Sequence, residues 1–170
     1  MTNHAGHNRF PSDVSIRHEF KPGDIGYLTY LHGVLYAKEC GWDHTFESYV
    51  AIPLSRFAQS HSERERIWLL ESSGVIAGSI AIVNSSDANA QLRWFLLHPD
   101  LRGRGLGRAL MEDAMAFCRA QKYQTVFLWT EARLTVAAAL YRSVGFQLTE
   151  EISHEQWGTT VVEQRYDKTL

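Results

Sequence analysis

The sequence has no long apolar run and very few cysteines. No apolar stretch in the 170 residues approaches the roughly 18 to 20 residues that a membrane-spanning helix needs, and the polar start lacks the apolar core of a signal peptide. Only Cys40 and Cys118 are present, without the spacing of a structural zinc site or the cysteine density of a disulfide scaffold. We therefore expect a cytoplasmic protein without membrane span, disulfide or metal, in which both cysteines are buried thiols.

An excess of positive charge is also absent, because the formal net charge is -2. A domain that binds nucleic acids in general is usually basic, so we expect no nucleic-acid partner. The charges are unevenly spread, since residues 93–142 hold eight basic and four acidic residues, a local balance of +4 that leaves -6 elsewhere. This distribution favours a small anionic ligand in the middle of the chain and a cationic partner elsewhere.

Hydrophobic periodicity predicts one domain over residues 14–170, after a loose polar tail at residues 1–13. Short apolar runs predict strands at 14–20, 67–70, 75–83, 90–97, 125–129, 146–152 and 160–166. Helical spacing predicts helices at 25–41, 45–60, from 106 onward and around 137–144. Asp24 is expected to cap the first helix, Pro53 to kink or break the second, and Gly145 to end the last. This order predicts an α/β (α+β) fold, with helices flanking a mixed sheet.

Three glycines at alternate positions join a predicted strand to a predicted helix. They are Gly103, Gly105 and Gly107, within Arg102-Gly-Arg-Gly-Leu-Gly-Arg108, which we call the phosphate loop. Free backbone N–H groups and the positive end of a helix dipole favour an anion such as phosphate there. The G-x-G-x-G spacing is not the dinucleotide fingerprint G-x-G-x-x-G, and no Gly-Lys-Ser/Thr follows for a nucleotide P-loop. The alternative is that the glycines only form a tight turn between strand and helix.

The phosphate loop resembles the R/Q-x-x-G-x-G/A signature of the GNAT superfamily of acyl-CoA-dependent N-acyltransferases. A second segment, Leu140-Tyr-Arg-Ser-Val-Gly-Phe146, is similar to the family's L-Y-x-x-x-G-F ending and follows the apolar run 126–129. The flanks at 32–42 and 155–158 resemble the acetyltransferase half of proteins that fuse a MarR-type regulator to a GNAT domain, and we expect a stand-alone version. The resemblance implies a GNAT-like mixed, mostly antiparallel sheet of six to seven strands, flanked by about four helices and splayed between the fourth and fifth strands.

The same resemblance implies that the chain binds acetyl-CoA as a cosubstrate and needs no metal. The diphosphate would lie on the phosphate loop, and the pantetheine arm would pair with the preceding strand as an added strand. The residues expected to bind acetyl-CoA are Phe95, Leu96, Leu97, Arg102, Gly103, Arg104, Gly105, Leu106, Gly107 and Arg108. Three arginines of one loop cannot all face phosphate, so we expect at least one of them to be solvated or ion-paired.

Acetyl transfer requires a proton donor for the departing thiolate and a neutral amine. The resemblance implies that Tyr141 is the acid, although helical periodicity alone would place it in the core. Many relatives carry a glutamate on the strand before the phosphate loop, but residues 90–97 contain no acid, and Gln91 cannot take a proton. The base is left open among acids near the first two helices, a water chain, or an amine that arrives neutral.

In this family the region between the first two helices usually lines the acceptor pocket. The candidate acceptor-binding residues there are Glu39, Trp42, Asp43 and Glu47. Carboxylate pairing and cation–π contact would suit an amine with an apolar body. The alternative for these residues is a solvated, charged helix face.

We therefore predict an N-acetyltransferase that acts on a small-molecule or amino-acid-like amine, by direct attack in a ternary complex. One alternative is a non-catalytic acyl-CoA-binding sensor or interaction module, and another is a protein or peptide N-acetyltransferase. The aromatic residues Trp42, Trp157 and Tyr166 are expected to be exposed, where they would serve a homodimer contact.

Overall fold

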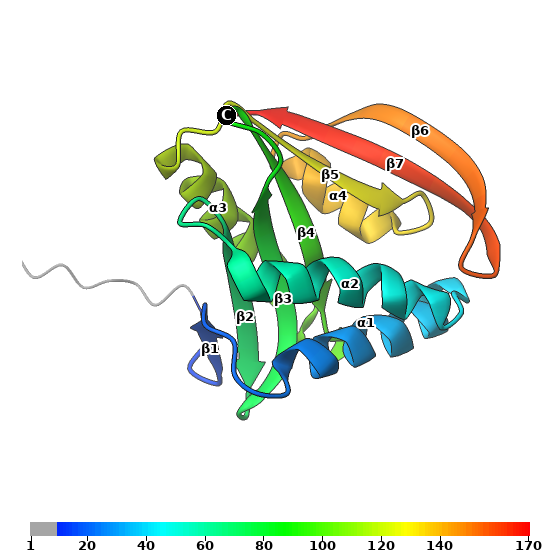
Figure 1. Cartoon of the computed structure of the whole chain (residues 1–170), viewed down its shortest axis with the longest axis horizontal. Coiled ribbons are helices and arrows are strands. Elements are labelled where there is room, and N and C mark those ends of the chain that lie inside the picture. Colours follow the sequence, from blue (N-terminus) through cyan, green and yellow to red (C-terminus); the bar gives the residue numbers. More distant parts are fainter. Residues whose placement is uncertain (1–9) are drawn as a thin grey trace, which may run out of the picture.

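A seven-stranded sheet forms the centre of the computed structural model, which describes residues 10–170 (Figure 1). Residues 1–9 of the expected tail lie outside the described residues. The strands are β1 (Val14–Arg17), β2 (Arg66–Ser72), β3 (Val75–Asn84), β4 (Asn89–Leu97), β5 (Thr125–Glu131), β6 (Gln147–Gln156) and β7 (Thr159–Thr169). Their order is β1-β2-β3-β4-β5-β7-β6, and only β4 and β5 pair in parallel. The predicted mixed, mostly antiparallel sheet is confirmed.

Helices cover both faces of the sheet. The α-helices in residues 10–170 are α1 (Asp24–Cys40), α2 (Thr45–Ser60), α3 (Leu106–Ala120) and α4 (Thr135–Ser143), and a 3-10 turn, η1 (Pro99–Leu101), precedes the phosphate loop. Helices α1 and α2 lie side by side across one face, and α3 and α4 pack on the other (Figure 1). None of the helices in residues 10–170 combines the length and apolar character that crossing a bilayer requires.

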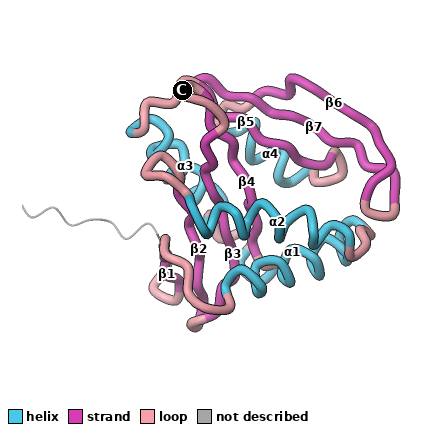
Figure 2. Tube along the Cα trace, in the orientation of Figure 1, coloured by secondary structure: helices cyan, strands magenta, loops and turns pink. Residues whose placement is uncertain are grey.

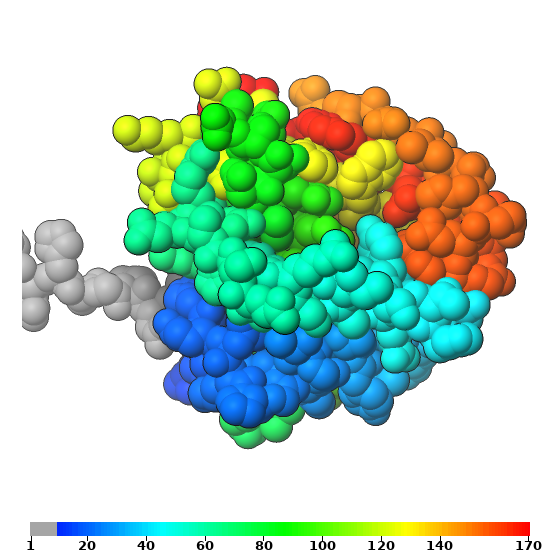
Figure 3. All heavy atoms as spheres, viewed as in Figure 1, coloured from blue at the N-terminus to red at the C-terminus, as the bar shows by residue number. Residues whose placement is uncertain are grey.

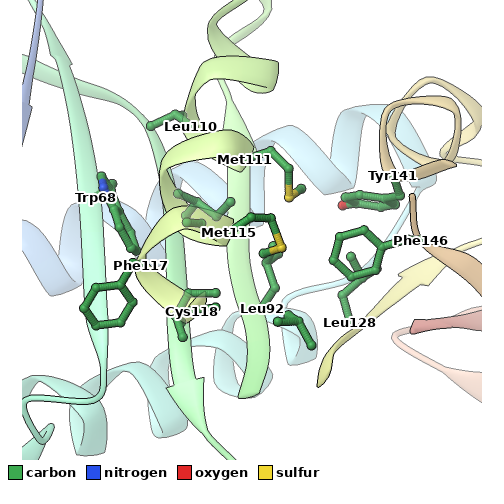
Figure 4. Packing of buried hydrophobic residues seen from close by; sticks show 14 of the residues in the cluster. Trp68, Leu92, Leu110, Met111, Met115, Phe117, Cys118, Leu128, Tyr141 and Phe146 are labelled. Atoms are coloured by element: carbon green, nitrogen blue, oxygen red, sulfur yellow. The ribbon is translucent and has the colours of Figure 1, made fainter. Parts of the chain in front are cut away.

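A hydrophobic core lies on each face of the sheet, where the sheet packs against its helices. Side chains alternate along β2, so Trp68 and Leu70 pack toward α3, whereas Ile67 and Leu69 pack toward α1 and α2. The Met111 side chain extends from α3 toward Tyr141 in the core under α3 and α4 (Figure 4). Both cysteines are free and buried in these cores, as predicted.

The parallel pairing of β4 with β5 is very short. The ladder joins residues 89–91 of β4 to residues 125–127 of β5 and then ends. Beyond this point the two strands diverge, as the trace in Figure 2 shows. Within the described residues, the rest of β4 therefore has no strand paired to it on the β5 side, and the predicted splay between the fourth and fifth strands is confirmed.

A β-bulge lies on β4 where it leaves β5. The register with β3 passes from Ala81↔Arg93 to Ser79↔Leu96, so Trp94 and Phe95 stand opposite a single residue of β3. Trp94 takes a left-handed φ of 47°. The buried Ser79 hydroxyl donates a 2.6 Å hydrogen bond to the Trp94 carbonyl, which satisfies this displaced backbone group.

The prediction that Asp24 caps α1 is wrong. Gly23, with φ of 95°, takes the cap position, and Asp24 is the first residue of the helix. Its carboxylate instead accepts a hydrogen bond from the Lys21 amide and forms an ion pair with Arg17 at 2.6 Å. Arg17 also pairs with Glu71 at 2.8 Å. β1 ends at this arginine, three residues before the predicted end of the strand.

Helix α2 continues through Pro53, so the proline does not break it into two helices. The end of α4 follows the prediction, since Gly145 has a φ of 93° immediately after the last turn. The final two strands are longer than predicted and extend to a two-residue turn at Trp157 and Gly158. Both turn residues have positive φ, of 52° and 80°, as a type I′ hairpin turn requires.

The tip of the β6–β7 hairpin docks on the junction between α1 and α2 (Figure 3). The Asp43 amide donates a 2.9 Å hydrogen bond to the Trp157 carbonyl, and the Trp157 ring lies 4.3 Å from that of Trp42. The expectation that Trp42, Trp157 and Tyr166 are exposed is therefore wrong, because their exposed fractions are 6%, 6% and 0%. These aromatic residues build the interior and offer no surface to a second copy.

The core under α3 provides a test of the packing. Leu110 is fully buried, so Leu110→Ala leaves a cavity and should lower the free energy of unfolding by about 2–5 kcal/mol. The same replacement at the exposed Leu148 of β6 is the control and should cost less than about 1 kcal/mol. Urea unfolding of both variants measures the difference. Equal losses at the two positions would contradict the assignment of Leu110 to the core.

Candidate active site

Two hollows meet where β4 and β5 diverge. A large groove of about 530 Å³ runs past the phosphate loop and α4, and an inner cavity of about 110 Å³ lies between α2, the β4 bulge and the β5–β7 ladder. Four residues line both hollows: Tyr36, Phe95, Leu134 and Tyr141. Molecules held in the groove and in the cavity would therefore approach one another beside these four side chains.

The glycines of the phosphate loop have two different roles. Gly103 and Gly105 have φ of 74° and 78°, and a Cβ on either would meet no atom within 4 Å. They line the large groove, and Gly105 caps the N-terminus of α3. Gly107 instead permits close packing, because its Cβ would lie 3.3 Å from side-chain atoms of Leu97 and Leu140. The first two glycines thus leave backbone amides open to an anion at a helix N-terminus.

Side chains of the loop arginines already have partners. Arg102 donates a 2.7 Å hydrogen bond to Glu39 and another, of 3.0 Å, to the Leu97 carbonyl. Arg104 pairs with Asp13 at 2.8 Å. The expectation that at least one loop arginine is ion-paired is confirmed. An anion in the groove would therefore depend mainly on the backbone amides and the N-terminus of α3.

The main chain of β4 forms the opposite side of the large groove. Phe95, Leu96 and Leu97 line it, beyond the point where pairing with β5 ends. Every residue that we expected to bind acetyl-CoA lines this groove except Arg104, which points to Asp13. An extended amide chain can pair with a strand that has one free edge.

Tyr141 of α4 lies at the meeting point of the two hollows. Its ring centroid is 6.1 Å from that of Phe95, and only 5% of the residue is exposed. Burial raises the pKa of the Tyr141 hydroxyl, the nearby Tyr36 acts in the same direction, and a hydrogen bond with Thr130 opposes them. Burial therefore favours the protonated hydroxyl and makes it a weaker acid than that of an exposed tyrosine.

Two glutamates that the sequence analysis did not identify line the inner cavity. Glu131 of β5 and Glu163 of β7 are direct partners across the antiparallel ladder, so their side chains share a face. Glu131 is 3% exposed, and its two oxygens accept hydrogen bonds from the amide and Nε of Arg133, at 2.8 and 2.9 Å. Only the pairing of two distant strands brings these acids together.

Glu163 has the properties of a proton acceptor. Burial raises the pKa of its carboxyl above the ordinary value, and His154, whose Nε2 lies 3.0 Å from Oε2, acts in the opposite direction. A carboxylate with a raised pKa is a stronger base than an exposed one. Unlike Glu131, Glu163 has no arginine of residues 10–170 bound to both of its oxygens.

The structure places the four candidate acceptor-binding residues in different environments. Trp42 is buried and lines the inner cavity. Glu39 lines the large groove, where it binds Arg102. Asp43 is exposed and accepts hydrogen bonds from Thr45, and Glu47 packs against α1. Asp43 and Glu47 are not among the residues that line the inner cavity.

Aromatic rings form much of the wall of the inner cavity. Tyr36 stacks on Trp42 with ring centroids 5.0 Å apart and an interplanar angle of 7°. Phe46, Tyr49 and Trp157 continue this wall toward the hairpin tip. An apolar body fits such a wall, and a cationic group would find ring faces there.

Comparison with known proteins agrees with this arrangement. The model of the acetyltransferase (GNAT) family matches residues 34–146. N-acetyltransferase family 8 member 3 of Rattus norvegicus is 36% identical over 89 residues, which cover 49% of this chain and 39% of that protein. The chain thus matches about two fifths of the length of this relative.

Two solved structures share the fold. An acetyltransferase from Streptococcus agalactiae has a TM-score of 0.77 at 23% identity, over 94% of this chain and 100% of its own. An acetyltransferase from Salmonella typhimurium, solved with its cofactor acetyl-CoA, has a TM-score of 0.71 at 18% identity, over 93% of this chain and 94% of its own. The family match spans most of the chain, including the phosphate loop and Tyr141. This chain belongs to the GNAT family of acetyltransferases.

Proposed function

We propose that the protein is an acetyl-CoA-dependent N-acetyltransferase that acetylates the amine of a small molecule by direct attack. One observation carries the proposal: the large groove and the inner cavity meet at Tyr141. A donor bound in the groove and an acceptor bound in the cavity would present their reacting ends to each other at this residue. Holding two reactants together in this way supplies much of the lowering of a reaction barrier.

The residues of the large groove fit acetyl-CoA. Gly103 and Gly105 leave open space beside the N-terminus of α3, where a diphosphate would bind to backbone amides. The free edge of β4 at residues 95–97 would hold the amide-containing arm. When bound, acetyl-CoA supplies an activated thioester carbonyl and a thiolate leaving group.

Glu163 and Tyr141 divide the proton transfers between them. Glu163 accepts a proton from the acceptor amine, whose nitrogen then forms the new bond to the acetyl carbon as the carbon–sulfur bond breaks. Tyr141 donates its hydroxyl proton to the departing sulfur, and the tyrosinate then takes back the proton that the newly acetylated nitrogen loses. Proton transfers of this kind contribute typically about 10²- to 10⁴-fold to a rate. Glu163 replaces the strand glutamate that many relatives carry and residues 90–97 lack.

The two cysteines favour direct transfer over an acetylated cysteine. Burial raises the pKa of Cys40 to about 11 and that of Cys118 to about 12, so both remain thiols at neutral pH. Neither cysteine is among the residues that line the two hollows. The amine itself therefore attacks the thioester.

A non-catalytic acyl-CoA sensor is the main alternative, since it would use the same groove without turnover. A protein or peptide acceptor is a second alternative, because the inner cavity is partly open. The cytoplasmic location, the single domain over residues 14–170, the homodimer and the similarity of the flanks to MarR–GNAT fusion proteins remain predictions.

The phosphate loop provides the first functional test. Gly105→Ala forces a side chain into a left-handed conformation, at about 1 kcal/mol, and puts a methyl group in the groove, so the KM for acetyl-CoA should rise about tenfold. Gly74→Ala is the control. Gly74 lies in the β2–β3 turn, outside the groove, and its φ of 77° gives a side chain there the same strain. The KM of Gly74→Ala for acetyl-CoA should equal that of the parent protein, although the variant should lose about as much stability as Gly105→Ala. Steady-state kinetics measure acetyl-CoA binding and thermal melting measures stability. Equal KM values in the two variants would contradict the binding of acetyl-CoA at the phosphate loop.

Tyr141 provides the second test. Tyr141→Phe removes the proton donor but keeps the ring, so kcat should fall about 10²-fold or more while acetyl-CoA binding persists. The control is Tyr123→Phe, because the Tyr123 hydroxyl donates to the Arg64 carbonyl and to Asn84 Oδ1 and the residue lines neither hollow. Thiol release over a panel of amines measures both variants. Turnover of no amine by the parent protein, while acetyl-CoA binds, would favour the sensor.

Glu163 provides the third test, through pH. The carboxylate accepts a proton only when ionised, so kcat should fall as the pH drops through its raised pKa, at a higher pH than an ordinary glutamate would show. Glu163→Gln should lower kcat about 10²- to 10⁴-fold and remove this acid limb. Glu155→Gln, at an exposed position of β6, is the control and should keep the parent profile. An acid limb that survives in Glu163→Gln would assign the base elsewhere.

A further inference from the structure

An arginine in the wall of the inner cavity has no acidic partner. The Arg93 guanidinium of β4 lies 5.1 Å from the Trp94 ring centroid and 6.0 Å from that of Tyr49. No carboxylate of residues 10–170 lies within ion-pairing distance of it. Burial lowers the pKa of Arg93, which shows that water does not fully solvate its charge. The face of an aromatic ring attracts a cation, but it does not accept hydrogen bonds from the N–H groups of the cation as an oxygen does.

This lack of a partner distinguishes Arg93 from the other arginines around the two hollows. Arg102 pairs with Glu39 at 2.7 Å, and Arg133 pairs with Glu131 at 2.9 Å. Arg108 binds Ser143 at 2.9 Å and lies 3.9 Å from Glu112. A half-buried guanidinium without an anion is costly unless something else supplies one. The bound acceptor is the molecule in a position to do so.

The far wall of the cavity carries the opposite charge. Glu163 lies there next to the Glu131–Arg133 pair, with His154 Nε2 3.0 Å from its Oε2 and no arginine partner among residues 10–170. Tyr49, whose ring centroid lies 6.0 Å from the Arg93 guanidinium, lines the same cavity as Glu163, and these two charges shift the pKa of its hydroxyl in opposite directions. A polyamine would be repelled by Arg93, and a phosphate dianion would be repelled by Glu163. A zwitterion, with its amine and its anion close together, satisfies both.

A second set of unpaired groups lies beside the same cavity. The Trp42 indole N–H is buried and has no hydrogen-bond partner within residues 10–170, and it can only donate. His32, 3% exposed, bonds the Leu28 carbonyl through Nδ1, which leaves Nε2 as an acceptor without a partner in the same described part of the chain. Both residues line the inner cavity. The two unpaired atoms are themselves almost fully buried, so a ligand in the cavity would reach the Trp42 donor or the His32 acceptor only if that ring moved.

We propose that the acceptor is a free α-amino acid with an apolar or aromatic side chain, whose carboxylate binds Arg93 and whose amine faces Glu163. This inference rests on the proposed function. The aromatic wall of Tyr36, Trp42 and Phe46 holds the side chain. Arg93 is a specificity-determining residue, which selects acceptors that carry a carboxylate next to the amine.

Matched acceptors test the proposal. L-Phenylalanine, L-leucine and L-methionine are each compared with the amine that lacks only the carboxylate: 2-phenylethylamine, 3-methylbutylamine and 3-(methylthio)propylamine. We expect kcat/KM to be at least tenfold higher for at least one amino acid than for its amine. In Arg93→Gln this ratio should fall at least tenfold, mainly through the KM of the amino acid. Arg93→Lys keeps the charge and should restore part of the ratio.

Arg66→Gln is the matched control. Arg66 also stacks on an aromatic ring, 4.5 Å from the Phe117 centroid, but lines neither hollow. Its ratio should equal that of the parent protein. Thermal melting of each variant shows whether the replacement has changed folding, and Arg93→Lys provides the test if Arg93→Gln does not fold.

Calorimetric titration of the same amino acids and amines separates this inference from the proposed function. Amino-acid binding that needs Arg93, without acetyl transfer, would support the role of Arg93 in selecting amino acids but refute both the enzymatic proposal and their role as acceptors. If acetyl transfer to the amines is as efficient as transfer to the amino acids, the inference is refuted and the proposed N-acetyltransferase function is supported. Binding of none of the three amino acids, a preference for spermidine, or a preference for peptide N-termini that does not depend on Arg93 would also overturn it.

Discussion

The early end of the β4–β5 ladder is the constraint on which the rest of the site depends. The two parallel strands pair over three residues each and then separate, and the β4 bulge at Trp94 and Phe95 turns β4 away. Ser79 stabilises this bulge from the neighbouring strand by binding the Trp94 carbonyl. The separation leaves one edge of β4 free toward the large groove and opens the inner cavity beside it. A continuous ladder would close both hollows and remove their junction at Tyr141.

The hairpin tip sets the limits of the inner cavity. A type I′ turn directs Trp157 toward the α1–α2 junction, where its carbonyl is bound by the Asp43 amide. Gly158 allows this approach, since a Cβ there would lie 2.8 Å from an Asp43 oxygen. Strand β7 thereby brings Glu163 next to the cavity. The role of Asp43 in the structure is therefore to hold the hairpin against the helices.

How much the sequence predicts depends on how local each feature is. The phosphate loop, the helix that follows it and the C-terminal glycine of α4 are local patterns, and each was predicted from consecutive residues. Glu131 and Glu163 lie 32 positions apart in the sequence. They become neighbours only because β7 pairs with β5 in the sheet. No spacing rule connects them. Arg17 likewise takes the Asp24 carboxylate that the local pattern assigns to a helix cap.

The charge distribution has a different meaning in three dimensions. The basic segment 93–142 suggested a positive site for an anion, but Arg102, Arg104 and Arg133 are neutralised by Glu39, Asp13 and Glu131. What distinguishes the groove is its open backbone amides. What distinguishes the inner cavity is Arg93, which has no acidic partner among residues 10–170, together with Glu163, which has His154 beside it but no arginine of that same described range. A cavity of this kind attracts no ion strongly from a distance. A neutral zwitterion, the kind of acceptor that we propose, would meet an opposite charge at each of these two residues.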